Sequence, residues 1–199
     1  RICNQNIVMF RAADGRVRAL ADYCPHRKLP LSMGTLRDGE IECGYHGIRF
    51  DGEGRCTFIP AQDQIPSVGL QARTYLTAER YGLVFVWIGD DAKADEALIP
   101  AFPEAEMDGW VGVEGYCHGQ ANYLLVLDNL NDLSHLAYVH KATFGSGGLN
   151  VIPVEVTTEK DVVKTRRWLP GSAQTGFIKK ARRFGHDGPV DREQTSDFL

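Results

Sequence analysis

Residues 24–46 read CPHRKLPLSMGTLRDGEIECGYH, and this stretch carries the strongest functional signal in the chain. It opens with Cys24 and His26 in a C-x-H pattern and closes with Cys43 and His46 in a C-x2-H pattern, with sixteen residues between the two patterns. Each pattern places one thiol and one imidazole in what we expect to be a tight turn. Such a set could hold zinc, but zinc sites more often use C-x2-C or H-x3-5-H pairs. The spacing therefore predicts a metal centre held by two loops.

Short β-rich runs surround these loops and are separated by turn-forming dipeptides. The expected strands are Ile7–Phe10, Val17–Leu20, Glu40–Cys43 and Arg49-Phe50, with Asp-Gly or Glu-Gly pairs around them. A strongly apolar strand over Tyr81–Ile88 closes the group, and a short helix is expected over Ala92–Leu98. We therefore expect a small all-β domain over residues 1–90 and a linker over residues 91–110.

The two loop sequences CPHRKLPLSMG and CGYHGIRFDGEGRC resemble the oxygenase class of Rieske domains, and the resemblance extends over residues 3–88. A Rieske two-iron, two-sulfur (2Fe-2S) cluster has two cysteines on one iron and two histidines on the other. The resemblance therefore implies that Cys24, His26, Cys43 and His46 bind such a cluster. Respiratory Rieske proteins carry an additional, disulfide-bonded cysteine in each loop, whereas a leucine and a tyrosine occupy those places here.

The second half of the sequence mixes helix and strand patterns. Val111–Val126 could form a long strand, and Leu127–His140 has the composition and apolar spacing of a helix. Val154–Thr158 and Val162–Trp168 are typical of the two strands of a hairpin. The expected fold class is thus α+β. By resemblance, the all-β Rieske domain is followed by residues 111–199 as the first, truncated part of a helix-grip-like catalytic domain.

The segment LLVLDNLNDLSHLAYVHKATFG, residues 124–145, resembles the mononuclear-iron motif of the same oxygenases. In that family the motif supplies two histidine ligands, which correspond to His135 and His140. Asp132 corresponds to the acidic residue that bridges the two metal centres, and Asn129 corresponds to an amide found in demethylase-like members. The third iron ligand of the family is a carboxylate on a later helix, which implies that this ligand is absent from the chain.

The spacing of the two histidines constrains their local structure. Positions i and i+5 diverge by about 140° on an ideal helix, so the chain must bulge or bend between His135 and His140. Asp132 lies three residues before His135, where its carboxylate could accept an imidazole N–H. We expect solvated surface positions, and not the missing ligand, for Asp187, Asp191 and Asp197.

The resemblance implies the terminal oxygenase component of a multi-component enzyme. Electrons from NADH would pass through a separate flavin or iron-sulfur reductase and the 2Fe-2S cluster to a mononuclear Fe(II), which activates O2 beside an aromatic substrate. The motifs look most like vanillate O-demethylase oxygenase subunits, which implies O-demethylation or hydroxylation of a methoxy-aromatic acid. The same resemblance implies a homotrimer in which each cluster serves a neighbouring subunit's iron. The alternatives are a ring-hydroxylating dioxygenase large subunit and a Rieske electron carrier without oxygenase activity.

Composition favours a globular protein of the cytoplasm. The chain has 199 residues, of which 43% are hydrophobic and 24% charged, enough to bury a core. A net charge of -4 gives no basic surface for nucleic acid, and no apolar run approaches the roughly 20 residues that cross a bilayer. Five cysteines without dense spacing suit a reducing compartment. We expect a fragment truncated at both ends, because the chain opens without a methionine and stops without a closing element.

The residues that follow His46 predict a cluster of low reduction potential. In respiratory Rieske proteins a serine and a tyrosine, two and four residues after the second histidine, donate hydrogen bonds to the cluster sulfurs. Ile48 and Phe50 occupy these places and cannot donate. We expect a midpoint near the lower end of the Rieske range of about -150 to +300 mV, measured by redox titration of the EPR signal. A midpoint above about +100 mV on that scale would contradict the argument.

Overall fold

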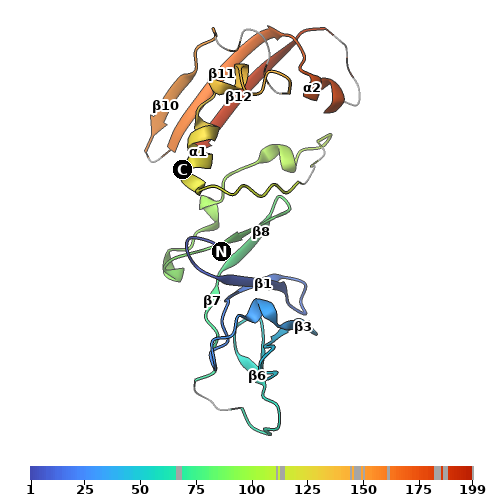
Figure 1. Cartoon of the computed structure of the whole chain (residues 1–199), viewed down its shortest axis with the longest axis vertical. Coiled ribbons are helices and arrows are strands. Elements are labelled where there is room, and N and C mark those ends of the chain that lie inside the picture. Colours follow the sequence, from blue (N-terminus) through green and yellow to red (C-terminus); the bar gives the residue numbers. More distant parts are fainter. Residues whose placement is uncertain are drawn as a thin grey trace. The chain divides into compact units, whose positions relative to one another are not determined.

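The computed structural model describes residues 1–65, 69–110, 112, 115–143, 145, 149, 151–160, 162–181, 185 and 188–198. The chain forms two compact units, Arg1–Glu114 and Gly115–Leu199 (Figure 1). The finer division into residues 1–90, 91–110 and 111–199 stays a prediction. Within the described ranges, no helix is long and apolar enough to span a membrane.

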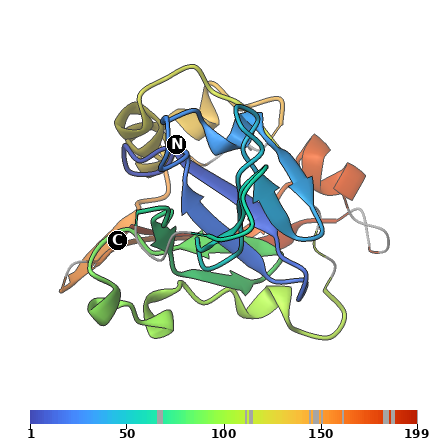
Figure 2. The same ribbon diagram turned by 90° about the horizontal axis from the view of Figure 1, so that it is seen from below.

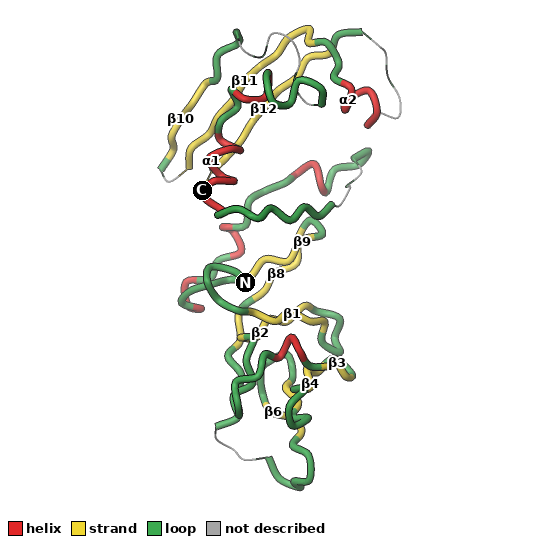
Figure 3. Tube along the Cα trace, viewed as in Figure 1, coloured by secondary structure: helices red, strands yellow, loops and turns green. Residues whose placement is uncertain are grey.

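The first unit is built mainly from short antiparallel strands, drawn yellow in Figure 3. The strands are β1 (Ile7–Arg11), β2 (Val17–Ala21), β3 (Thr35–Arg37), β4 (Glu40–Glu42), β5 (Arg49–Phe50), β6 (Cys56–Phe58), β7 (Thr74–Tyr75), β8 (Thr77–Arg80) and β9 (Leu83–Val86). They pair in the orders β1-β2-β7, β3-β4-β5-β6 and β8-β9. Figure 2 shows the blue strands β1 and β2 side by side. The four strands expected at the start of the chain are therefore confirmed by β1, β2, β4 and β5.

Turn chemistry explains where several of these elements end. The strand expected over Tyr81–Ile88 is shorter, because Tyr81 and Gly82 take positive φ values of 56° and 75° in the turn between β8 and β9. The helix expected over Ala92–Leu98 is instead two 3-10 turns, η2 (Asp91–Lys93) and η3 (Glu96–Leu98). An aspartate side chain caps each of them, and a cap at both starts favours two short turns over one helix. Two further 3-10 turns, η1 (Leu31–Met33) and η4 (Pro103–Ala105), complete the first unit's assigned elements.

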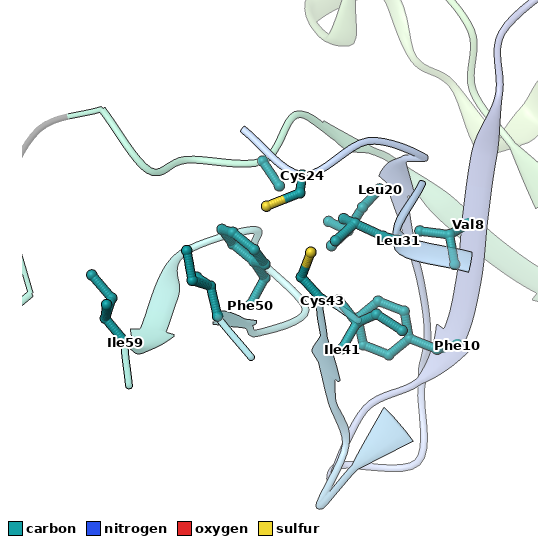
Figure 4. Close-up of a cluster of buried hydrophobic side chains, with 11 residues drawn as sticks. Val8, Phe10, Leu20, Cys24, Leu31, Ile41, Cys43, Phe50 and Ile59 are labelled. Atoms are coloured by element: carbon teal, nitrogen blue, oxygen red, sulfur yellow. The ribbon is translucent and has the colours of Figure 1, made fainter. Parts of the chain in front are cut away.

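A cluster of buried apolar side chains lies beneath both cysteine-bearing loops (Figure 4). Its members are Val8, Phe10, Leu20, Cys24, Leu31, Ile41, Cys43, Ile48, Phe50, Ile59 and Ala72. Leu20, Leu31 and Phe50 are fully buried, at 0% exposure. The Cys24 loop follows β2, and the Cys43 loop joins β4 to β5. The core therefore fixes the points from which both loops start.

The second unit contains a three-stranded antiparallel sheet of order β10-β11-β12, drawn orange to red in Figure 1. Its strands are β10 (Glu155–Glu159), β11 (Val162–Ser172) and β12 (Val190–Phe198). Its helical elements are α1 (Tyr123–Asn131), α2 (Gly176–Ala181) and the 3-10 turn η5 (His135–Ala137). The predicted hairpin is confirmed by β10 and β11. Asp191 and Asp197 lie in a strand of this sheet, at exposed positions, and Asp187 falls outside the described residues.

Two sequence predictions for the second unit are wrong. The strand expected over Val111–Val126 is not observed in the described part of that range, since residues 115–120 have no helix or strand and α1 begins at Tyr123. The apolar residues that end the range, Tyr123–Val126, fit either structure, and the Asn122 side chain favours a helix by accepting the Leu124 N–H at 3.0 Å. The helix expected over Leu127–His140 stops at Asn131, because the following aspartate side chain accepts a backbone N–H two residues later.

Candidate functional site

The two cysteine loops are closed by the same backbone hydrogen bonds. In the first loop the Cys24 N–H donates to the Leu29 carbonyl at 2.8 Å, and the Lys28 N–H donates to the Cys24 carbonyl at 2.9 Å. In the second loop Cys43 makes the equivalent bonds, at 2.8 Å to the residue five positions later and at 2.9 Å to the residue four positions later. The loops are thus equivalent, although the histidine stands at the second place after one cysteine and at the third after the other.

The closing residue of each loop needs a left-handed backbone. Lys28 has a φ of 62° and Gly47 a φ of 69°. Glycine adopts this conformation readily, whereas a lysine is strained in it. The Lys28 ammonium lies 4.5 Å from the centroid of the Tyr23 ring, a cation–π contact that favours the observed loop. Neither of these left-handed positions was singled out from the sequence.

The two thiols are buried next to each other. Cys24 and Cys43 are each 2% exposed and form no disulfide. Figure 4 shows both sulfur atoms among the side chains of the core cluster. Burial raises the pKa of the Cys24 thiol, the backbone N–H of His26 opposes this effect, and the neighbouring Cys43 thiol adds to it. Metal binding would release the protons of both thiols, because only thiolates act as ligands.

The two imidazoles of these loops are exposed and lie together. The ring centroids of His26 and His46 are 4.7 Å apart, with their planes inclined by 59°. The Tyr45 ring stacks on His46 at 3.9 Å with an angle of 27°, a contact that sequence reasoning missed. A buried pair of thiols beside an exposed pair of imidazoles matches the two-by-two donor set of a Rieske cluster. The first unit therefore fits that group.

The second candidate centre is the pair His135 and His140, whose ring centroids are 5.2 Å apart. The chain bends between them, as the spacing requires, through the 3-10 turn η5 and the turns that follow. The Nδ1 atom of His135 is hydrogen-bonded to the backbone carbonyl of Asp132. Because a carbonyl only accepts, Nδ1 carries the proton and Nε2 remains able to bind a metal. The two imidazoles, with the Nε2 of His135 able to bind a metal, fit the histidine part of an iron site that has two histidines and one carboxylate.

The carboxylate of Asp132 does not have the predicted contact. It was expected to accept an imidazole N–H from His135, but it accepts the backbone N–H of Ser134 at 2.8 Å. The reason is that the helix ends here, and the side chain satisfies a backbone group of the next turn. Hydrogen bonds from Ser134 hold the pKa of the Asp132 carboxyl below its usual value, so this exposed group is ionised at neutral pH. Asn129 is exposed one turn earlier, in α1.

The turn that carries His140 depends on a glycine that the sequence did not single out. The His140 carbonyl accepts the backbone N–H of Thr143 at 2.9 Å and that of Gly145 at 2.7 Å. A Cβ atom at Gly145 would lie 2.4 Å from the Leu136 carbonyl oxygen and 2.8 Å from the Cα of Lys141. Gly145 therefore lets the chain fold back tightly onto the segment between the two histidines.

Two family models match the chain, one in each unit. A model of the Rieske 2Fe-2S domain matches residues 1–69, and a model of the vanillate O-demethylase oxygenase C-terminal domain matches residues 119–199. The chain carries a Rieske 2Fe-2S domain followed by an oxygenase C-terminal domain of the vanillate O-demethylase type. The first match contains both cysteine loops, and the second contains the histidine pair.

Similar proteins of known name support the same family. A vanillate O-demethylase oxygenase subunit of Pseudomonas sp. (strain ATCC 19151) is 41% identical over 202 residues, which cover 99% of this chain and 60% of the relative. A crystal structure of dicamba monooxygenase bound to 3,6-dichlorosalicylic acid matches with a TM-score of 0.87 at 35% identity, covering 99% of this chain and 58% of that one. Dicamba monooxygenase with non-heme iron and dicamba matches with a TM-score of 0.77 at 33% identity, covering 96% and 54%. The chain thus spans somewhat more than half the length of these relatives.

Replacing Gly145 with alanine should damage the histidine site specifically. The added Cβ cannot fit beside the Leu136 carbonyl, and overpacking of this kind costs about 1–3 kcal/mol. We expect a lower free energy of unfolding in urea and a loss of mononuclear iron, with the 2Fe-2S content retained. Gly119→Ala is the matched control, because a Cβ there meets no atom within 4 Å. Normal mononuclear iron content in the Gly145 variant would remove the role assigned to this turn.

Proposed function

We propose that this chain forms part of a terminal oxygenase component that oxidises an aromatic substrate with O2, by O-demethylation or hydroxylation. A methoxy-aromatic acid is the proposed substrate class, in keeping with the names of the vanillate and dicamba relatives. The observation that carries the proposal is the presence in one chain of a Rieske donor set and a separate histidine pair. An electron carrier would need only the first.

The proposed ligands follow from the two donor sets. Cys24 and Cys43 would hold one iron of the cluster, and His26 and His46 the other. His135, through Nε2, and His140 would hold the mononuclear iron together with a carboxylate from elsewhere in the whole protein. When bound, the cluster supplies single electrons and the mononuclear iron supplies activation of O2. NADH would provide the electrons through a separate flavin or iron-sulfur reductase.

Asp132 is proposed to connect the two centres between subunits of a homotrimer. Its backbone carbonyl orients the His135 ring, and its ionised carboxylate is exposed. One carboxylate oxygen accepts from Ser134 at 2.8 Å, and a carboxylate can accept further hydrogen bonds. The side chain is therefore suited to accept an N–H from a cluster histidine of a neighbouring subunit. Asn129, one helical turn before it, is proposed to act beside the same site.

The rival functions are distinguishable by iron content and product. A Rieske electron carrier would hold two irons per chain, and an intact oxygenase would hold three. A ring-hydroxylating dioxygenase would place both oxygen atoms on the ring, whereas O-demethylation releases the methyl group as formaldehyde and leaves a phenol. The relatives are named as demethylases and monooxygenases, and these names favour O-demethylation over ring dioxygenation.

Replacing His26 or His46 with alanine should abolish the rhombic EPR signal of the reduced cluster, because each histidine is proposed as one of only two protein ligands to its iron. His118→Ala is the control, since His118 is also an exposed histidine but belongs to neither donor set. Survival of the signal in both loop variants would show that the ligand assignment is wrong.

Replacing Asp132 with asparagine should leave both metal centres in place and stop electron transfer between subunits. The change keeps the size of the side chain and removes its charge, and loss of such an outer partner typically costs about 10- to 100-fold in activity. The measurements are iron content, single-turnover oxidation of the cluster and product formed in the complete enzyme. Near-normal turnover would remove the bridging role. Loss of the mononuclear iron would instead make Asp132 a ligand.

A further inference from the structure

The sheet of the second unit carries the carboxylates of its described strands on one face only. Directly opposed residues of paired strands point to the same side, and Arg167 lies opposite Gln194 while Leu169 lies opposite Arg192. Both arginines therefore project from one face, which we call the arginine face. The acidic residues of β10 and β12 occupy the other face by register and alternation, namely Glu155, Glu159, Asp191, Glu193 and Asp197. No carboxylate of these three described strands shares the arginine face.

Arg167 is a buried cation on this face. It is 4% exposed, and its Nη1 donates to the Leu149 carbonyl at 3.1 Å. Its Nε has no hydrogen-bond partner among the residues that the structure describes. Burial lowers the pKa of the guanidinium, which is the expected effect on a cation that loses water. Such a group is costly to bury without an anion, so an anion close to this face would be stabilised.

A cavity opens beside the arginine face, between β12 and α2. Its volume is about 300 Å³, within the range of small-molecule sites. It is lined by Thr175, Phe177, Ile178, Arg192, Glu193 and Gln194. Phe177 and Ile178 provide an apolar wall, and the Glu193 carboxylate is paired with Arg166 on the opposite face. The Gln194 side-chain oxygen is buried without a hydrogen-bond partner in the described part of the chain.

The cavity adjoins the turn that carries His140. A Cβ atom placed on Gly176, the first residue of α2, would lie 3.8 Å from the carbonyl oxygen of Ala142. Ala142 is two residues from His140, and Gly176 lies between the cavity residues Thr175 and Phe177. The helix that forms the apolar wall therefore begins close to the segment that carries His140.

We propose that this cavity binds the aromatic substrate and that Arg192, assisted by Gln194, recognises its carboxylate. The inference rests on the proposed function, because it takes the iron site at His140 as the place of oxidation. A guanidinium matches a planar carboxylate with two parallel N–H donors, and the Gln194 amide can add a third. Arg167 lies diagonally across the strand pair from Arg192, at about 7–8 Å for such neighbours, and adds positive charge.

The test compares an acid with its neutral amide in the complete holoenzyme. The probes are 4-methoxybenzoate and 4-methoxybenzamide, and the measurements are Kd by calorimetry and KM and kcat by formaldehyde release. Arg192→Met should raise Kd and KM for the acid by about 10- to 100-fold, as expected for a charged hydrogen bond, with little change for the amide. Gln194→Glu keeps the shape of the side chain and adds a negative charge, so it should also weaken binding of the acid. Lys164→Met is the control, because it removes a positive charge from the opposite face of β11.

Three results would overturn the inference: wild-type affinity for the acid in both cavity variants, equal weakening of acid and amide, or a wild-type enzyme that oxidises neutral aromatics without binding the acid. The last result leaves the proposed function standing. Conversely, arginine-dependent binding of the acid without any oxygen-dependent product would support the carboxylate site and reject the proposed oxygenase reaction.

Discussion

The closure of the two cysteine loops is the constraint on which the first unit depends. Each cysteine is tied by backbone hydrogen bonds to the residues four and five positions later, so both sulfurs start from equivalent loops. The closing residue must be left-handed, which costs a non-glycine residue such as Lys28 about 1–2 kcal/mol and costs Gly47 little. Buried Leu31 and Phe50 lie beneath these loops. The sulfurs therefore face the core while the imidazoles face solvent, and this is the polarity that a cluster with an exposed histidine edge requires.

The histidine pair of the second unit is positioned by different means. Local hydrogen bonds position the residues around both histidines. The Asp132 carbonyl sets the tautomer of His135, and the His140 carbonyl collects the N–H groups of Thr143 and Gly145. This histidine site is sensitive to a single added methyl group at Gly145, because that group would clash with the backbone of the preceding turn.

The sequence predicted the short strands of the first unit, and it failed where two structures fit one pattern. Turn dipeptides bounded β1, β2, β4 and β5. Cysteine and histidine spacing singled out the first donor set, whereas His135 and His140 were singled out only by resemblance to an oxygenase motif. The residues before Leu127 were expected to form a strand, and the contact that favours a helix is the single cap at Asn122. The contact of Asp132 was misassigned for a related reason. An i, i+3 rule holds only inside a helix, and the helix has already ended there.

The strand β12 escaped prediction for a reason connected with function. Its sequence VDREQTSDF is polar on both faces, so the alternation of apolar and polar residues that marks a half-buried strand is missing. The positions of β12 on the arginine face are nevertheless half-buried, and they hold Arg192, Gln194 and Ser196. A polar inward face destabilises a sheet unless its groups find partners. Within the described residues, the Nε of Arg167 and the Oε1 of Gln194 lack them. Local rules are most often broken at functional sites, and the Nε–H of Arg167 is a donor that an anionic ligand of the proposed site would favour.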